Sequence, residues 1–253
     1  YARSKVDAER SISDLAGDGF SPVFLRNGTV YGLATAAKVA LRRSLGKDAD
    51  GPVSRWLNRP LSTRLSMLLA PLRPAPDLVS LIAFMFGLAG AALLAVGQGL
   101  AGGLLVQASS VADGVDGEVA RLQLRGGPRG ALLDGVLDRV GDAAILAGLG
   151  LWALDGHDAQ VVLVLTVAAT TGALLSMASK DRAAALGLPP APERPLGWLL
   201  GGRDGRLLLV AVGAVLGAPV AALAAITATS ALSLGLRVAF LRCPPAREVG
   251  SWS

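Results

Sequence analysis

The sequence predicts an all-α integral membrane protein with six transmembrane helices, preceded by an amphipathic helix at the membrane interface. Three observations carry this prediction: 52% of the 253 residues are hydrophobic, only 17% are charged, and the mean hydropathy is +0.53. Soluble domains usually carry about 25% charged residues. The 32 glycines and the aromatic content of 4% suit helices that pack closely in lipid. A soluble α/β enzyme is therefore disfavoured.

Six apolar segments follow residue 76, each close to the ~20 residues needed to cross a bilayer. The fifth is short, and only Gly217-Ala218-Pro219 separates it from the sixth, so five spans are the alternative. The predicted segments cover residues 77–96, 99–123, 130–153, 159–180, 204–217 and 219–241.

The basic residues favour six spans and predict the orientation. Twelve of the 24 Lys and Arg residues precede the first segment, and the connections at 97–103, 154–158 and 217–219 carry none. Under the positive-inside rule we expect both termini and the basic connections on the cytoplasmic side of the plasma membrane. This asymmetry and contact with anionic lipid account for the net charge of +5, so we expect no nucleic-acid partner.

The region before the first span is polar. Residues 53–69 alternate basic and apolar side chains and include Trp56, which predicts an interfacial helix with Arg toward the headgroups. An ordinary surface helix is the alternative. We divide the chain into a short cytoplasmic segment (1–50), the interfacial helix (51–76), the six-helix membrane domain (77–242) and a cytoplasmic tail (243–253).

Four carboxylates lie inside the second and third apolar segments, where charges are costly and usually functional. Asp113 and Asp116 are three residues apart, and Asp134 and Asp138 are four apart, so each pair shares one helix face. Counting outward from the turn between the helices places the pairs at similar depth. Facing carboxylates repel unless cations neutralise them. With one His and one Cys in the chain, a zinc site of these ligands is excluded, and Mg²⁺ or Mn²⁺, two ions in our interpretation, is favoured.

Small and basic residues flank the carboxylates. Gly117 and Ala120 leave room for a flat ligand, Gly130 does the same on the next helix, and Arg121 can reach a phosphate. Alone, each has an ordinary interpretation, helix packing for the small residues and a membrane-edge position for Arg121. For any one of the four aspartates, the alternative to a metal ligand is a helix cap or an ion pair with Arg121 or Arg139.

The combined string Asp113-x2-Asp116-Gly117-x2-Ala120-Arg121-x8-Gly130-x3-Asp134-x3-Asp138 resembles the signature of the CDP-alcohol phosphotransferase family. The resemblance covers roughly residues 53–242. It implies six transmembrane helices, often in a homodimer. It also implies a metal-dependent reaction that passes a substituted phosphate from a CDP-alcohol to an acceptor hydroxyl and releases CMP.

The resemblance also assigns roles. It makes the four aspartates metal ligands and Asp138 the general base, which a carboxylate beside the metal can be. It makes Gly117, Ala120, Arg121 and Gly130 nucleotide-contacting positions. Pro76-Asp77-Leu78-Val79-Ser80 stands where the family often has a Pro-Asn-x-x-(Ser/Thr) element, so Asp77 and Ser80 are further nucleotide candidates. A helix N-cap at Asp77 is the alternative, and we expect Asp142 to be structural.

Three segments resemble one branch, the di-myo-inositol-phosphate-phosphate synthases: Ser54-Arg55-x2-Asn58-Arg59-x2-Ser62, residues 134–142 and residues 202–208. In that branch the donor is CDP-inositol and the acceptor inositol phosphate, and residues 1–50 would be the remnant of a cytidylyltransferase-like domain. A phosphorylated acceptor needs a cationic pocket, for which Lys180, Arg203 and Arg206 are candidates; membrane-edge anchoring is their alternative role. A phospholipid synthase using CDP-diacylglycerol and a non-enzymatic cation carrier are the alternative functions.

Overall fold

The computed structural model describes residues 51–69, 72, 74–122, 127–187 and 202–242. The predicted N-terminal segment (1–50) and tail (243–253) lie outside these residues. Apart from its turns, the described chain is helical and contains no strand, which confirms the all-α part of the prediction. Its elements are η1 (Ser54–Asn58), α4 (Arg59–Leu69), α5 (Pro76–Ala95), α6 (Gly99–Leu122), α7 (Pro128–Ala153), α8 (Ala159–Ala185), α10 (Arg203–Val215) and α11 (Pro219–Arg242).

Each of the six apolar segments forms one helix, from α5 to α11. Within the described residues, α5, α8 and α11 are long and apolar enough to cross a membrane. Helices α6 and α7 have the length but carry the carboxylates, and the 13 residues of α10 extend only about 20 Å. Length and composition therefore identify three spans, and the six-span arrangement stays a prediction.

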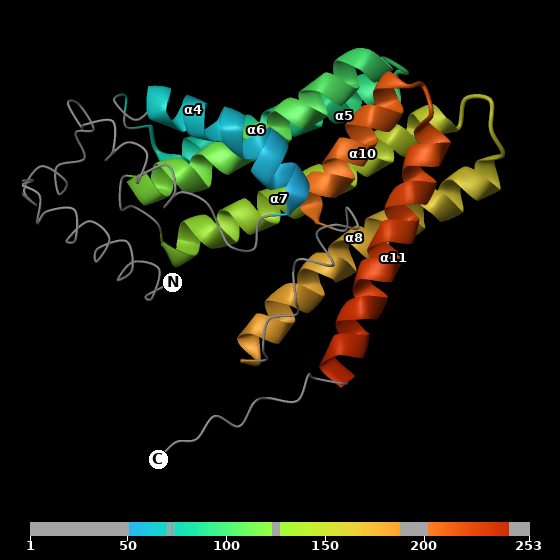
Figure 1. Cartoon of the computed structure of the whole chain (residues 1–253). Coiled ribbons are helices and arrows are strands. Elements are labelled where there is room, and N and C mark those ends of the chain that lie inside the picture. Colours follow the sequence, from blue (N-terminus) through green and yellow to red (C-terminus); the bar gives the residue numbers. More distant parts are fainter. Residues whose placement is uncertain (1–50, 70–71, 73, 123–126, 188–201, 243–253) are drawn as a thin grey trace, which may run out of the picture.

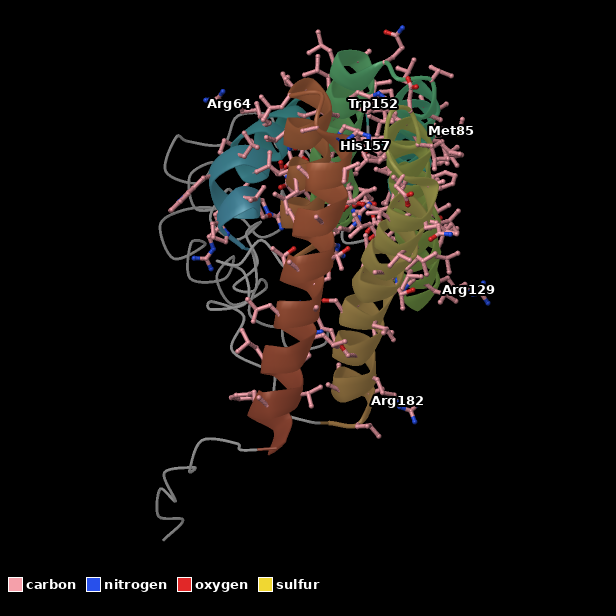
Figure 2. The ribbon with its side chains drawn as sticks, turned by 90° about the vertical axis from the view of Figure 1, so that its right-hand side faces the viewer. Arg64, Met85, Arg129, Trp152, His157 and Arg182 are labelled. Atoms are coloured by element: carbon pink, nitrogen blue, oxygen red, sulfur yellow. The ribbon has the colours of Figure 1, made fainter. Side chains whose placement is uncertain are left out.

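The helices form a bundle whose short turns lie at one end (Figure 1). These turns follow α5, α7 and α10, and the backbone reverses at Gly97 (φ 75°) and Gly217 (φ 68°), in the left-handed region that glycine adopts without strain. Helices α8 and α11 then run side by side away from the turns and extend beyond the other helices. In Figure 2, Trp152 and His157 lie toward the turns, whereas Arg129 and Arg182 lie toward the opposite end.

The apolar core lies in the half of the bundle near the turns. Leu94, Leu149 and Leu223 come from three different helices and have no exposed surface. Small residues let the helix backbones touch, as their abundance predicts. A Cβ atom added to Gly148 would lie 2.2 Å from the carbonyl oxygen of Ala91, so α7 and α5 can approach this closely only with glycine there.

The amphipathic segment packs against α6 with its polar side inward. Asn58, Ser62 and Ser66 are buried, whereas Trp56 and Leu68 are each 73% exposed. The segment is helical over 54–69, as η1 and α4, and its position at the membrane interface stays a prediction. The prediction that its arginines face the headgroups is wrong for Arg59, whose guanidinium lies 2.8 Å from the buried carboxylate of Glu118.

Candidate active site

A pocket opens where the first half of α5, the second half of α6, the first half of α7 and the start of α10 converge. The four helices bring together three of the predicted aspartates and Arg203, with serine, aromatic and aliphatic side chains between them. The lining residues are Ser80, Ala83, Phe84, Gly87, Ser109, Asp113, Asp134, Leu137, Asp138, Gly141, Ile145 and Arg203.

The carboxylates of Asp113, Asp116 and Asp134 form the centre of the site. One oxygen of each lies within 4.8 Å of the others. Asp116 is 6% exposed, and both of its oxygens accept hydrogen bonds, one from the Ser80 hydroxyl and one from the Gly117 backbone N–H. Three hard oxygen ligands at this separation fit Mg²⁺ or Mn²⁺, whose charge would relieve their mutual repulsion.

Asp138 lies beside this cluster and contacts Arg203. The guanidinium of Arg203 spans three carboxylates: its nitrogens lie 2.7 Å from Asp113, 3.1 Å from Asp138 and 3.0 Å from Asp142. A planar fork with several donors suits such a bridge. The structure therefore places Arg203, a predicted acceptor-phosphate residue, directly against two of the predicted metal ligands.

The other two predicted acceptor residues lie in different surroundings. Arg206 is 3% exposed, and its Nη2 lies 3.8 Å from Asp142, so Asp142 holds both arginines of α10. Lys180 is exposed near the end of α8. A buried basic residue that the sequence did not single out, Arg237 of α11, donates to the Ser176 carbonyl and, at 2.7 Å, to the Ser179 hydroxyl.

The predicted nucleotide positions surround the carboxylates on α5, α6 and α7. Ser80 contacts Asp116, and a Cβ atom on Gly130 would lie 3.2 Å from the Asp77 carboxylate, so glycine lets α5 and α7 meet here. The N-cap residue of α5 is Ala75, so the alternative of Asp77 as N-cap is wrong. Gly117 and Ala120 lie one to four residues after Asp116 on α6. Arg121 belongs to the last turn of that helix, and its side chain lies outside the described residues.

Among the described residues, Arg139 does not pair with any of the four predicted metal ligands. Arg139 instead contacts the carboxylate of Asp181 on α8 and the Gly135 carbonyl. The contacts of these four carboxylates include the Ser80 hydroxyl, the Gly117 N–H and the Arg203 guanidinium.

Sequence reasoning missed a second polar cluster, on the side of α6 that faces α4. Glu118 is fully buried there, and Asn58 is buried against Ser110. The signal was present, because Asn58, Ser62 and Ser66 recur every four residues and therefore share one helix face.

These features define a helical protein with a carboxylate-lined pocket suited to divalent metal and phosphate chemistry. The profile of one family, CDP-alcohol phosphatidyltransferase, matches residues 73–236. The chain belongs to this family of membrane-bound enzymes, which confirms the resemblance seen in its sequence. Membership favours an enzyme over the alternative of a non-enzymatic carrier.

Several relatives match the chain. A bifunctional IPC transferase and DIPP synthase of Rubrobacter xylanophilus is 44% identical over 70% of this chain and 39% of the relative. A protein of the same name from Aquifex aeolicus is 34% identical over 72% of this chain and 42% of its own length. The chain thus spans about two fifths of these relatives. A phosphatidylinositol phosphate synthase of Mycolicibacterium smegmatis is 37% identical over 55% of this chain and 60% of the relative.

Solved structures share the fold. Phosphatidylinositol phosphate synthase of Mycobacterium tuberculosis, in complex with manganese and citrate, has a TM-score of 0.59 and 25% identity, covering 73% of this chain and 90% of that one. The same enzyme with CDP-DAG bound has a TM-score of 0.58 and 26% identity, covering 73% and 95%.

Proposed function

We propose that this protein transfers a substituted phosphate from a CDP-alcohol of the CDP-inositol type to a hydroxyl of inositol phosphate and releases CMP. The observation that carries the proposal is the convergence of Asp113, Asp116 and Asp134 within 4.8 Å beside Arg203. In this reaction the acceptor oxygen bonds to the phosphorus that bears the donor alcohol. The bond from that phosphorus to the bridging oxygen breaks, and CMP leaves.

The aspartates are proposed to hold two Mg²⁺ or Mn²⁺ ions, with Asp113, Asp116, Asp134 and Asp138 as the ligands. Bound divalent cations would neutralise the charge of the donor pyrophosphate. A solved neighbour in complex with manganese supports this assignment. Ser80 and the Gly117 N–H fix the orientation of the Asp116 carboxylate.

Asp138 is proposed to take the proton from the attacking hydroxyl. Its carboxylate lines the same pocket as Asp113 and Asp134, and a contact of 3.1 Å with Arg203 orients it. Gly117, Ala120, Arg121 and Gly130, with Asp77 and Ser80, are proposed to contact the nucleotide, because they surround the carboxylates on three helices.

Lys180, Arg203 and Arg206 are proposed to receive the phosphate of the acceptor. We expect Arg203→Ala to raise the acceptor KM about 10-fold, the loss of one charge-assisted contact, with little change in the donor KM. Initial rates with each substrate varied in turn measure both constants. Equal values in variant and wild type would remove Arg203 from the acceptor pocket.

The proposal places the pocket at the cytoplasmic side of a six-span bundle in the plasma membrane, with both termini on that side, and the protein as a homodimer. The segment η1–α4 would lie in the interface, which the outward Trp56 of η1 and Leu68 of α4 support. Reactivity of single introduced cysteines in intact cells tests the orientation.

A phospholipid synthase that uses CDP-diacylglycerol is the second candidate. The neighbour with CDP-DAG bound and the phosphatidylinositol phosphate synthases among the relatives favour it. Only the alcohol carried by the cytidine diphosphate differs between the two candidates.

CMP release by the purified chain separates the candidates. The protein is offered inositol phosphate with either CDP-inositol or CDP-diacylglycerol, in Mg²⁺ or Mn²⁺, and labelled donor is followed into the aqueous or the organic phase. We expect turnover with CDP-inositol and label in the aqueous phase. Turnover with CDP-diacylglycerol alone would establish the second candidate, and silence with both would overturn the proposed donor class.

A further inference from the structure

Glu118 is a fully buried carboxylate on α6 that the proposed reaction does not use. It follows Gly117 in the chain, two residues after Asp116. Successive residues of a helix are about 100° apart, so the side chain of Glu118 leaves α6 on the side roughly opposite to Asp113 and Asp116. Helix α6, which supplies two of the clustered aspartates, therefore carries a further carboxylate on its opposite face.

Donors from α4 surround this carboxylate. On Oε1, the Arg59 guanidinium lies at 2.8 Å, the Ser62 hydroxyl at 2.9 Å and the Thr63 hydroxyl at 3.3 Å. On Oε2, the Ser66 hydroxyl lies at 2.7 Å. Both carboxylate oxygens of Glu118 thus accept hydrogen bonds from side chains on successive turns of a single helix, α4.

These contacts join the outer segment to the bundle through a buried charge. Trp56 and Leu68 point outward, Ser62 and Ser66 are buried, and Leu69 packs against the apolar cluster of Val79, Val115 and Val119. Hydrogen bonds to a buried charge have fixed directions and lengths. The Glu118 contacts therefore set how α6 is rotated relative to α4, beside the packing of α6 on α5.

A second connection runs from the same segment toward Arg203. Gln107 of α6 donates to Asn58 at 2.8 Å, Asn58 donates to Ser110 at 2.9 Å, and Ser110 donates to Asp204 at 3.1 Å. Asp204 directly follows Arg203, whose guanidinium contacts Asp113 and Asp138. The segment η1–α4 thus supports both α6 and α10 from behind the pocket.

We propose that Glu118 is a positioning residue. By anchoring η1–α4 to the back of α6, it holds Asp113 and Asp116 turned toward Asp134 on α7. A loss of this anchor would let α6 rotate, and displacement of a reacting group by about 1 Å can cost 100-fold in rate. The catalytic part of this inference rests on the proposed function, and the metal-binding part does not.

Glu118→Gln tests the proposal in the purified full chain, with Ser230→Ala as the matched control. Ser230 is likewise fully buried, but lies on α11, away from α4. Mn²⁺ affinity is measured by electron paramagnetic resonance, alongside kcat, the donor KM and the thermal midpoint. We expect Glu118→Gln to weaken Mn²⁺ binding and to lower kcat about 10-fold each, with the donor KM changed less. The control should retain both wild-type values.

A residue that is only structural would lower the thermal midpoint and leave the Mn²⁺ affinity and kcat of the folded protein unchanged. That result would overturn the proposal. If Glu118→Gln does not fold, the double variant Ser62→Ala/Ser66→Ala removes two donors and no charge, and a smaller loss of Mn²⁺ affinity is expected. Unchanged affinity in that variant would equally overturn the proposal.

The two parts fail separately. If the wild-type chain released no CMP from any CDP-alcohol, the proposed function would be wrong. The comparison of Mn²⁺ affinities between wild type, Glu118→Gln and Ser230→Ala would still decide the positioning role.

Discussion

The half of the bundle near the turns and the half that carries the aspartates are held together differently. Near the turns, Leu94, Leu149 and Leu223 pack without exposed surface, and Gly148 lets two helix backbones touch. Such contacts are numerous, individually weak and tolerant of direction. This half provides a scaffold whose stability does not depend on any charge.

At the other half, the contacts are few and directional. Three carboxylates meet within 4.8 Å, one guanidinium bridges Asp113, Asp138 and Asp142, and Glu118 takes its donors from α4. Like charges at this separation oppose folding, so this half relies on the scaffold and would be stabilised by neutralising cations. The comparison separates an apolar half that supplies packing from a polar half that holds the proposed site.

The largest effect is expected from a variant that removes one carboxylate of the polar half and leaves the apolar half unchanged. Asp134→Asn should lower CMP release about 1000-fold, as the loss of one group that stabilises charge in the transition state does. Its thermal midpoint without metal should not fall, since one of three repelling charges is gone. Asp155→Asn, at an exposed acid in the turn after α7, is the control and should keep full activity. Metal-dependent turnover by Asp134→Asn would contradict the carboxylate site.

The next effect breaks the apolar half alone. Leu149→Ala should cost about 2–5 kcal/mol of unfolding free energy, because the fully buried side chain leaves a cavity. Scanning calorimetry in detergent measures the loss. The kcat of the fraction that stays folded should match wild type, since Leu149 lies about two helical turns beyond Asp142. A large fall in kcat at low temperature would show that the two halves are coupled.

The smallest effect is expected from a surface variant at the start of a helix. Asp158 is the N-cap of α8 and accepts hydrogen bonds from the backbone N–H groups of Gln160 at 2.9 Å and Val161 at 3.0 Å. Asp158→Ala should cost about 1 kcal/mol through the loss of this cap. Asp158→Ser keeps a capping oxygen and should stay close to wild type. Both variants should turn over like wild type, and altered activity would contradict the separation of roles.

Apolar periodicity and length were enough to predict the helices. The segment predicted at 77–96 is α5 at Pro76–Ala95, and that predicted at 130–153 is α7 at Pro128–Ala153. Spacing was also enough to place Asp113 and Asp116 on one face of α6, because helical periodicity decides which side chains share a face. Counting from the turn placed Asp134 at a similar depth on α7, where it meets them.

Partners across helices were not predictable in the same way. The polar face of α4 can be read from the sequence. That this face turns inward to Glu118 cannot, because a serine is buried or exposed according to the helix that packs opposite it. The sequence likewise indicates Arg203 as a cation near the pocket, but not that its guanidinium contacts Asp113, Asp138 and Asp142. Such contacts depend on how α10 packs against α6 and α7. No short sequence pattern indicates this packing.

The order of synthesis gives the Glu118 contact a further consequence. Arg59, Ser62 and Ser66 leave the ribosome more than fifty residues before Glu118 does. In the predicted six-span arrangement, α6 would enter the bilayer when the donors for its back-facing carboxylate already exist in the nascent chain. The helix would then meet lipid with this charge covered, at a stage when α7, α10 and α11 have still to be made.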